Sequence, residues 1–213
     1  MRPLRDRNDQ ARFDFYSPEE VMALVQAAAT EQDAAIYLTA AFSGLRMGEC
    51  LGVCWRDVDF DNRALRALRQ YTRGELVAPK SGHGRSMPLV DPVAQALARL
   101  SQRQRHTGRD DFVFCSPDGE PLDDSALRRR YKTARHATGL RPLRFHDLRH
   151  TFGSLAMNRA SIVQVQAWMG HADLKTTMRY LHHKSRADEA ELLSAAFAVD
   201  GAQVATTTLP RAR

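Results

Sequence analysis

The chain has 213 residues, 43% hydrophobic and 26% charged, which is typical of a globular protein and excludes disordered and collagen-like classes. Its formal net charge is +6, and 27 of its 31 basic residues are arginine. Guanidinium groups suit forked contacts with phosphate, although such an excess can also reflect the base composition of a gene.

Membrane and secretion signals are missing from the sequence. No stretch is apolar for long enough to cross a bilayer, and the first ten residues lack the apolar core of a signal peptide. The three cysteines, Cys50, Cys54 and Cys115, cannot all pair, so we expect buried thiols in a reducing, cytoplasmic compartment. Two neighbouring thiols are too few for a structural zinc site.

The chain begins with a polar segment, residues 1–16, which predicts a lead-in or linker. Ser17 then starts a helix as its N-cap, with Pro18 in the first turn and Glu20 completing a capping box. Residues 199–213 predict a disordered tail.

Between these ends, hydrophobic spacing predicts a mainly α-helical α+β fold. Further helices are predicted at 33–43, 47–53, 91–105, 123–137, 147–159, 161–169, 174–181 and 186–198. Strands are predicted at 55–60, 64–68, 75–78, 86–90 and 112–114. The first four would pair as two hairpins, which indicates a small antiparallel sheet of about three strands beside the helices.

A run of basic residues stands out within the predicted helix at 123–137 and the segment after it. Seven arginine or lysine residues and no acidic residue lie between Ser125 and His146. Arg128, Lys132 and Arg135 follow helical spacing and form one stripe. The sequence favours a contact with a DNA phosphate backbone over a merely solvated face, because uncompensated like charges repel one another.

Chemically versatile residues lie at helix ends and turns. His146 and Arg149 are three residues apart and share a helix face, where together they can bind a phosphate. Arg46 lies between two glycines that allow close approach to a ligand, with Glu49 placed to hold its guanidinium. Lys80 lies at the mouth of a glycine-rich hairpin. Each feature alone also fits an ordinary surface pair, helix corner or turn.

A fourth segment joins His171, at a helix junction, to Tyr180 nine residues later. Each is also an ordinary loop histidine or half-buried tyrosine when taken alone. The HDLRH sequence is similar to the helix of zinc peptidases, but Asp147 is one carbon short for the base, and Arg149 would repel a cation. We therefore expect no metal site.

Taken together, the four segments resemble the tyrosine recombinase, or phage integrase, family. The matching stretches are GLRMGE (44–49), PKSGHGRSMPL (79–89), HDLRHTFGS (146–154) and MGHADLKTTMRYLH (169–182), in the family's order and with similar spacing. The resemblance implies a catalytic domain over 17–198. It also implies an active site composed of Arg46, Lys80, His146, Arg149, His171 and Tyr180, with Glu49 and His150 in supporting positions.

The resemblance implies that Tyr180 attacks a DNA phosphodiester, giving a 3′-phosphotyrosyl link and a free 5′-hydroxyl. A tyrosine hydroxyl with its ordinary pKa of about 10 needs help to lose its proton. Arg46 and Arg149 would bind the non-bridging oxygens, whose charge grows in the transition state, and His171 would donate a further hydrogen bond.

Two proton transfers complete the implied reaction. His146 is the expected base for the tyrosine, and Lys80 is the expected acid for the departing 5′-oxygen. The covalent link conserves the energy of the phosphodiester bond, so rejoining a strand needs neither ATP nor metal, and we expect no cofactor.

The implied partner is double-stranded DNA, on which the chain is expected to self-associate as a tetramer, in the cytoplasm at the nucleoid. Members of the family usually carry a helical DNA-binding domain before this region, whereas about 16 residues precede it here. The chain is therefore expected to be a fragment or a minimal member. A type IB topoisomerase and a non-catalytic DNA-binding relative are the alternatives, but the full set of six residues argues against the latter.

Overall fold

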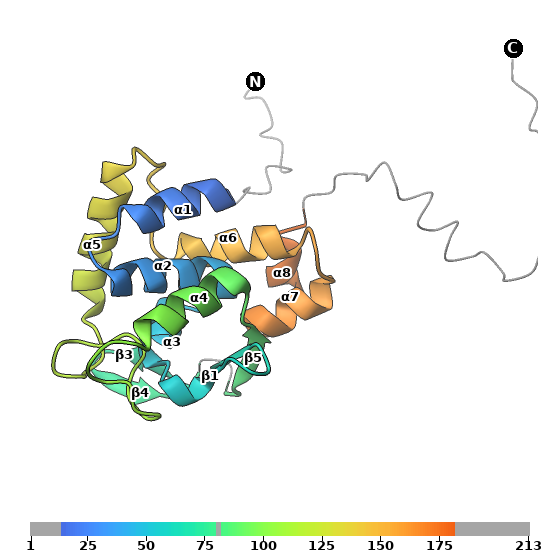
Figure 1. Ribbon diagram of the computed structural model, residues 1–213. Coiled ribbons are helices and arrows are strands. Elements are labelled where there is room, and N and C mark those ends of the chain that lie inside the picture. The colour runs from blue at the N-terminus through green and yellow to red at the C-terminus, as the bar shows by residue number, and fades with distance from the viewer. Residues whose placement is uncertain (1–13, 80–81, 182–213) are drawn as a thin grey trace, which may run out of the picture. The chain divides into compact units, whose positions relative to one another are not determined.

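The computed structural model describes residues 14–79 and 82–181 (Figure 1). Its helices are α1 (Pro18–Gln26), α2 (Glu31–Ser43), α3 (Met47–Gly52), α4 (Asp91–Leu100), α5 (Asp124–Ala137), α6 (Asp147–Ala156), α7 (Ile162–Met169) and α8 (Leu174–Met178). A 3-10 turn, η1 (Trp55–Asp57), precedes the strands β1 (Val58–Asp59), β2 (Ala64–Ala67), β3 (Gln70–Thr72), β4 (Glu75–Val77) and β5 (Arg85–Pro88). Lys80, the predicted helix at 186–198 and the predicted tail lie outside the described residues.

The fold is mainly helical with a small antiparallel sheet, as predicted. Helix α2 lies between α1 and α4 in Figure 1 and also contacts α6, so it forms the centre of the helical layer. It is apolar nearly all round, and its Ile36 and Tyr37 are fully buried. The three cysteines are free and buried, as expected. Within the described ranges no helix combines the length and the apolar character needed to cross a membrane.

Local sequence signals set the helix ends. Ser17 and Glu20 form the predicted capping box at the start of α1, with backbone-to-side-chain distances of 3.2 and 2.7 Å. Helix α2 ends at Gly44, whose φ of 70° is left-handed, and α7 likewise ends at Gly170. These two corners carry residues of the candidate site.

The sheet differs from the predicted pairing. Strands β1, β2 and β5 form a three-stranded antiparallel sheet, which confirms the first predicted hairpin. Strand β4 pairs with β3, which was not predicted, instead of with β5. The reason is the turn at Arg73 and Gly74, where both residues have positive φ, the backbone geometry of a two-residue hairpin.

Further expectations were wrong, among them the first half of the strand predicted at 55–60, which forms η1. Helix α4 ends at Leu100 instead of extending to Arg105, and Phe112–Phe114 forms a single bridge to Cys54 instead of a strand. The guanidinium of Arg103 accounts for the difference at 112–114, because it donates to the carbonyls of Phe112 at 2.8 Å and Val113 at 3.0 Å. These hydrogen bonds satisfy carbonyls that a strand would otherwise use.

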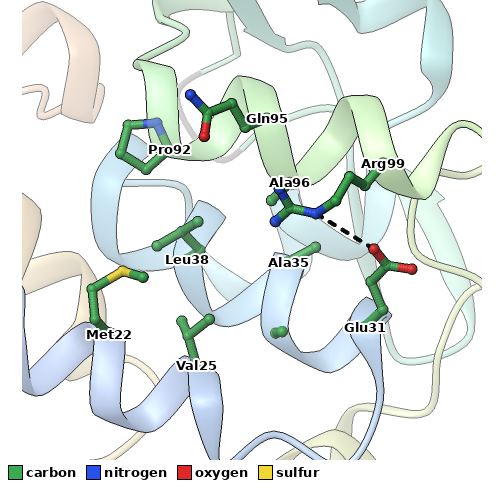
Figure 2. A pocket seen from close by; sticks show the side chains of 10 residues that line it. Met22, Val25, Glu31, Ala35, Leu38, Pro92, Gln95, Ala96 and Arg99 are labelled. Carbon is green, nitrogen blue, oxygen red and sulfur yellow. Dashed lines mark ion pairs between the residues drawn. The ribbon is translucent and has the colours of Figure 1, made fainter.

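Helices α1, α2 and α4 enclose a hollow of about 250 Å³ (Figure 2). Met22, Val25 and Leu38 line it, and at its edge Glu31 forms an ion pair with Arg99 at 3.6 Å. The lining contains no serine, cysteine, histidine or tyrosine that could act as a nucleophile or base.

The corner at Gly44 gives a test of the fold. A Cβ at Gly44 would collide with the Phe152 ring, whereas Gly139, which has φ of 65° after α5, has no heavy atom within 4 Å of the same position. Both substitutions to alanine force a left-handed backbone, at a cost of roughly 1 kcal/mol. Gly44→Ala should add an overpacking cost of about 1–3 kcal/mol.

Denaturant unfolding of Gly44→Ala and Gly139→Ala measures the difference. Equal losses of stability in the two variants would mean that Phe152 does not lie against this corner.

Candidate active site

Arg46 and Glu49 form the start of α3. The backbone NH of Arg46 donates to Oε2 of Glu49 at 2.7 Å, and Nη1 of Arg46 donates to Oε1 at 2.9 Å. The carboxylate therefore holds the arginine side chain, as the sequence predicted, and it also caps the helix, which was not predicted.

Arg85, on β5, is a second partner of Glu49 that sequence reasoning missed. Its Nη1 and Nη2 donate to both carboxylate oxygens at 2.7 Å, and its Nε donates to the Trp168 carbonyl at 2.7 Å. The available signal was the strand alternation, which places Arg85 on the same face as the buried Met87.

Glu49 is fully buried, so its charge depends on these partners. Burial alone would raise the pKa of its carboxyl, but the hydrogen bonds and charge of Arg85, followed by those of Arg46, lower it to about 2. The group is therefore a permanent anion at neutral pH, shared between two cations.

Arg149, on α6, is 3% exposed and donates to the carbonyls of Gly44 and Met169. Burial, together with repulsion from Arg46 and Arg85, lowers its pKa to about 9. It remains protonated at neutral pH.

The C-terminal end of α7 brings the three arginines together. Its last carbonyls, those of Trp168, Met169 and Gly170, accept hydrogen bonds from Arg85, Arg149 and Arg46 respectively, the last at 3.3 Å. The carbonyl end of a helix carries partial negative charge and stabilises nearby cations. Three guanidiniums and one carboxylate thus leave a net positive charge.

Tyr180 lies beside this cluster, directly after α8, and is 3% exposed. Its hydroxyl is 2.7 Å from Nδ1 of His150, and its ring stacks on that of His171 with centroids 6.3 Å apart. Burial raises the pKa of Tyr180 to about 12, although the charges of Arg149 and Arg179 oppose this shift.

His146 and His171, the other two predicted histidines, line the same pocket as Tyr180. His171 places Nδ1 at 2.9 Å from the Thr177 hydroxyl, and burial followed by the charges of Arg149 and Arg46 lowers its pKa to about 4. His146 is exposed and meets the His150 ring edge-on, with centroids 5.5 Å apart. The structure therefore brings His150, and not His146, into contact with the tyrosine hydroxyl.

Most of these side chains line one pocket of about 180 Å³. Its lining contains five of the six predicted catalytic residues and the supporting His150: Arg46, His146, Arg149, His150, His171 and Tyr180. Thr176 and Arg179 complete it and were not predicted. Lys80, the sixth, lies outside the described residues. Within those residues, no three His, Cys, Asp or Glu side chains are grouped to hold a metal ion.

The basic stripe on α5 is less isolated than the sequence indicated. Arg128 pairs with Asp124 at 3.0 Å, and Arg130 pairs with the buried Asp33 at 2.8 Å. Arg141 and Arg144 also have carboxylate partners. The premise of seven uncompensated charges was therefore wrong.

Of the predicted stripe, Lys132 is exposed, and Arg135 donates to the Leu143 carbonyl at 3.2 Å. Arg128 keeps more than half of its side chain exposed despite its ion pair. The predicted contact of the stripe with DNA therefore depends mainly on Lys132 and on Arg128, whose charge is partly neutralised by Asp124.

Comparison with known proteins gives one consistent result. A family model described as the phage integrase family matches residues 14–186. The tyrosine recombinase XerC of Pseudomonas syringae pv. tomato is 33% identical over 153 residues, covering 71% of this chain and 48% of that protein. A XerC-like tyrosine recombinase of Caldanaerobacter subterraneus is 24% identical, covering 88% of this chain and 56% of the relative. The chain thus spans about half the length of these relatives.

Among solved structures, the Tn1549 transposon integrase in complex with circular intermediate DNA aligns with a TM-score of 0.67 at 22% identity. The alignment covers 89% of this chain and 69% of the integrase. At that identity the likeness shows a shared fold.

The shared carboxylate gives a test of the site's construction. Arg85→Met leaves Glu49 buried with one cation fewer, and losing one partner of a buried ion pair costs roughly 3–5 kcal/mol. The matched control is Arg66→Met on β2, whose side chain is 42% exposed, so that its ion pair with Asp59 is worth under about 1 kcal/mol. Adding Glu49→Gln to Arg85→Met should recover part of the loss, because it removes the uncompensated charge.

The same carboxylate predicts a pH dependence. The folded pKa of Glu49 lies below its unfolded value of 4.5, so its stabilising contribution is present above pH 4.5 and is lost as the pH falls towards 2. Denaturant unfolding of wild type and Glu49→Gln from pH 7 to 2 should therefore converge at the acidic end. Parallel curves across that range would contradict the assignment of this pKa to Glu49.

Proposed function

The chain belongs to the phage integrase family, and we propose that it is a site-specific recombinase that cleaves and rejoins DNA strands through a 3′-phosphotyrosyl intermediate. The observation that carries the proposal is that Tyr180 lines the same pocket as Arg46 and Arg149. A nucleophile beside a cluster with net positive charge suits attack on a phosphodiester, which is itself an anion. We assign residues 17–198 to the catalytic domain.

The nucleophilic step uses the side chains that the pocket brings together. The Tyr180 oxygen bonds to the scissile phosphorus, while Arg46 and Arg149 bind the non-bridging oxygens as their charge grows. His171 donates a further hydrogen bond from the ring nitrogen that does not face Thr177. Their effect is largest in the transition state, where negative charge on these oxygens peaks.

The leaving group departs as the bond from phosphorus to the 5′-oxygen breaks. Lys80 is the proposed acid that protonates this oxygen, and His146 was the base predicted from the sequence for the tyrosine proton. Attack by a 5′-hydroxyl of another strand then reverses the step and frees Tyr180. The two steps exchange one phosphodiester for another with no net change in bond type.

The chemistry also supports self-association. Each chain offers one tyrosine nucleophile, and exchange between two duplexes cuts four strands. We therefore propose four copies on double-stranded DNA, acting at the nucleoid. Relaxation by a topoisomerase-like activity would use the same side chains, but relatives named as tyrosine recombinases favour strand exchange.

The first test of the proposal removes the nucleophile. Tyr180→Phe should fold and bind DNA but form no covalent adduct, because the hydroxyl supplies the bond to phosphorus. A randomised pool of nicked duplexes avoids the need to know the target site, and denaturing gels report the adduct. The matched control, Tyr71→Phe on β3, keeps the adduct, and an adduct that persists in Tyr180→Phe removes Tyr180 from the role.

The second test concerns the α5 stripe. Replacing Arg128, Lys132 and Arg135 by glutamine should weaken binding to unrelated DNA sequences about equally. It should also flatten the slope of log affinity against log salt by about 0.9 for each phosphate that the variant no longer neutralises. Arg99→Gln on α4 is the control, since its charge already pairs with Glu31. An unchanged slope in the triple variant would assign the stripe to a solvated face.

A further inference from the structure

His171 lies between α7 and α8, where three residues hold it in place. Its backbone NH donates to the Gln166 carbonyl at 3.2 Å, and its own carbonyl accepts from the Gln166 side chain at 3.1 Å. Its ring stacks on that of Tyr180 at an interplanar angle of 10°. Nδ1 lies 2.9 Å from the Thr177 hydroxyl. The position of the ring, its plane and one of its nitrogens are therefore fixed.

The ring of His171 is neutral, so it matters which nitrogen carries its one proton. Burial, then the charges of Arg149 and Arg46, lowers the pKa of His171 to about 4. In a neutral imidazole the nitrogen with the proton is a donor and the other nitrogen is an acceptor. Since Nδ1 faces Thr177, the ring can donate to an anion in the pocket only if the proton is on Nε2.

The Thr177 hydroxyl selects between the two tautomers. Thr177 is fully buried, and a buried hydroxyl needs an acceptor for its proton. Hydroxyls on other helices of this chain donate to a carbonyl one turn earlier, as those of Ser43, Thr133 and Thr138 do. Thr177 makes no such bond within the described residues, where its hydroxyl is paired with Nδ1 of His171. The hydroxyl therefore donates to Nδ1, and the proton of the ring is on Nε2.

Nε2 is the nitrogen of His171 that remains for a ligand. It has no hydrogen-bond partner within the described residues, and the ring lines the same pocket as Arg46 and Arg149. A proton on Nε2 adds a third donor to these two guanidiniums. The opposite tautomer would present a lone pair to a bound anion and would repel it.

We propose that Thr177 is a positioning residue, whose hydroxyl donates to Nδ1 of His171 and so holds the ring as the tautomer that donates from Nε2 to the scissile phosphate. This inference rests on the proposed function, in which His171 supplies that hydrogen bond. Thr177 acts through the histidine and touches no reacting atom. Without its hydroxyl, Nδ1 and Nε2 compete for one proton, and only part of the protein offers a donor to the phosphate.

Thr177→Val tests the tautomer directly, because valine has nearly the same shape and no hydroxyl. In ¹⁵N NMR of histidine-labelled wild type, Nε2 of His171 should resonate as a protonated nitrogen and Nδ1 as an unprotonated one. In Thr177→Val the two resonances should move towards each other as both tautomers become populated, and Thr177→Ser should restore them. The matched control is Thr39→Val on α2, whose hydroxyl is also buried but has no hydrogen-bond partner within the described residues.

Single-turnover cleavage of nicked duplexes measures the consequence for the reaction. Removing one donor to a developing oxyanion costs about 10²–10³ in rate, so Thr177→Val, which weakens the donor without removing it, should cost about tenfold. Thr177→Ser should recover most of that rate. In a His171→Phe background, which keeps a stacked ring but has no ring proton, adding Thr177→Val should cause no further loss. Thr177→Ala repeats the comparison if the valine variant folds poorly.

A wild type with the proton on Nδ1, or His171 resonances that stay unchanged in Thr177→Val, overturns the proposal. An equal rate loss from Thr177→Val with and without His171 also overturns it, because the threonine would then act on the fold alone. Absence of any adduct in the wild type contradicts the proposed function instead. The NMR comparison needs no cleavage, so it still decides whether Thr177 sets the tautomer.

Discussion

The buried carboxylate of Glu49 is the interaction on which the rest of the site depends. It accepts hydrogen bonds from Arg46 and Arg85, and so joins the start of α3 to the strand β5. Arg85 continues to the Trp168 carbonyl, which adds the end of α7. A buried charge without partners is costly, so this carboxylate fixes where the two guanidiniums lie.

The pairing of Glu49 with Arg85 also explains why the site has a net positive charge. Arg85 compensates Glu49 through two short hydrogen bonds, which leaves the more exposed Arg46 able to bind another anion. Arg149 adds a second cation, held against the carbonyls of Gly44 and Met169. The protein therefore keeps positive charge at the pocket by satisfying donors with backbone carbonyls, which carry only partial charge.

The sequence was informative where the determinants are local. The capping box at Ser17 and the glycine corners at 44 and 170 follow from neighbouring residues, and the structure has them. The charge count was misleading for two reasons: Arg130 meets Asp33 97 residues away, and Arg128 meets Asp124 just outside the counted segment. Arg85 and the contact of His150 with Tyr180 were missed because only the folded chain brings them together.

We propose that Arg46 and Arg149 act on the negative charge of the scissile phosphate. Cleavage rates on a phosphodiester and on a methylphosphonate, in which a neutral methyl replaces one non-bridging oxygen, measure this directly. We predict that wild type loses far more rate on the neutral substrate, relative to phosphate, than Arg149→Ala does. An equal ratio of the two rates in wild type and variant would contradict the account, because the guanidinium would then be indifferent to the charge that it is placed to stabilise.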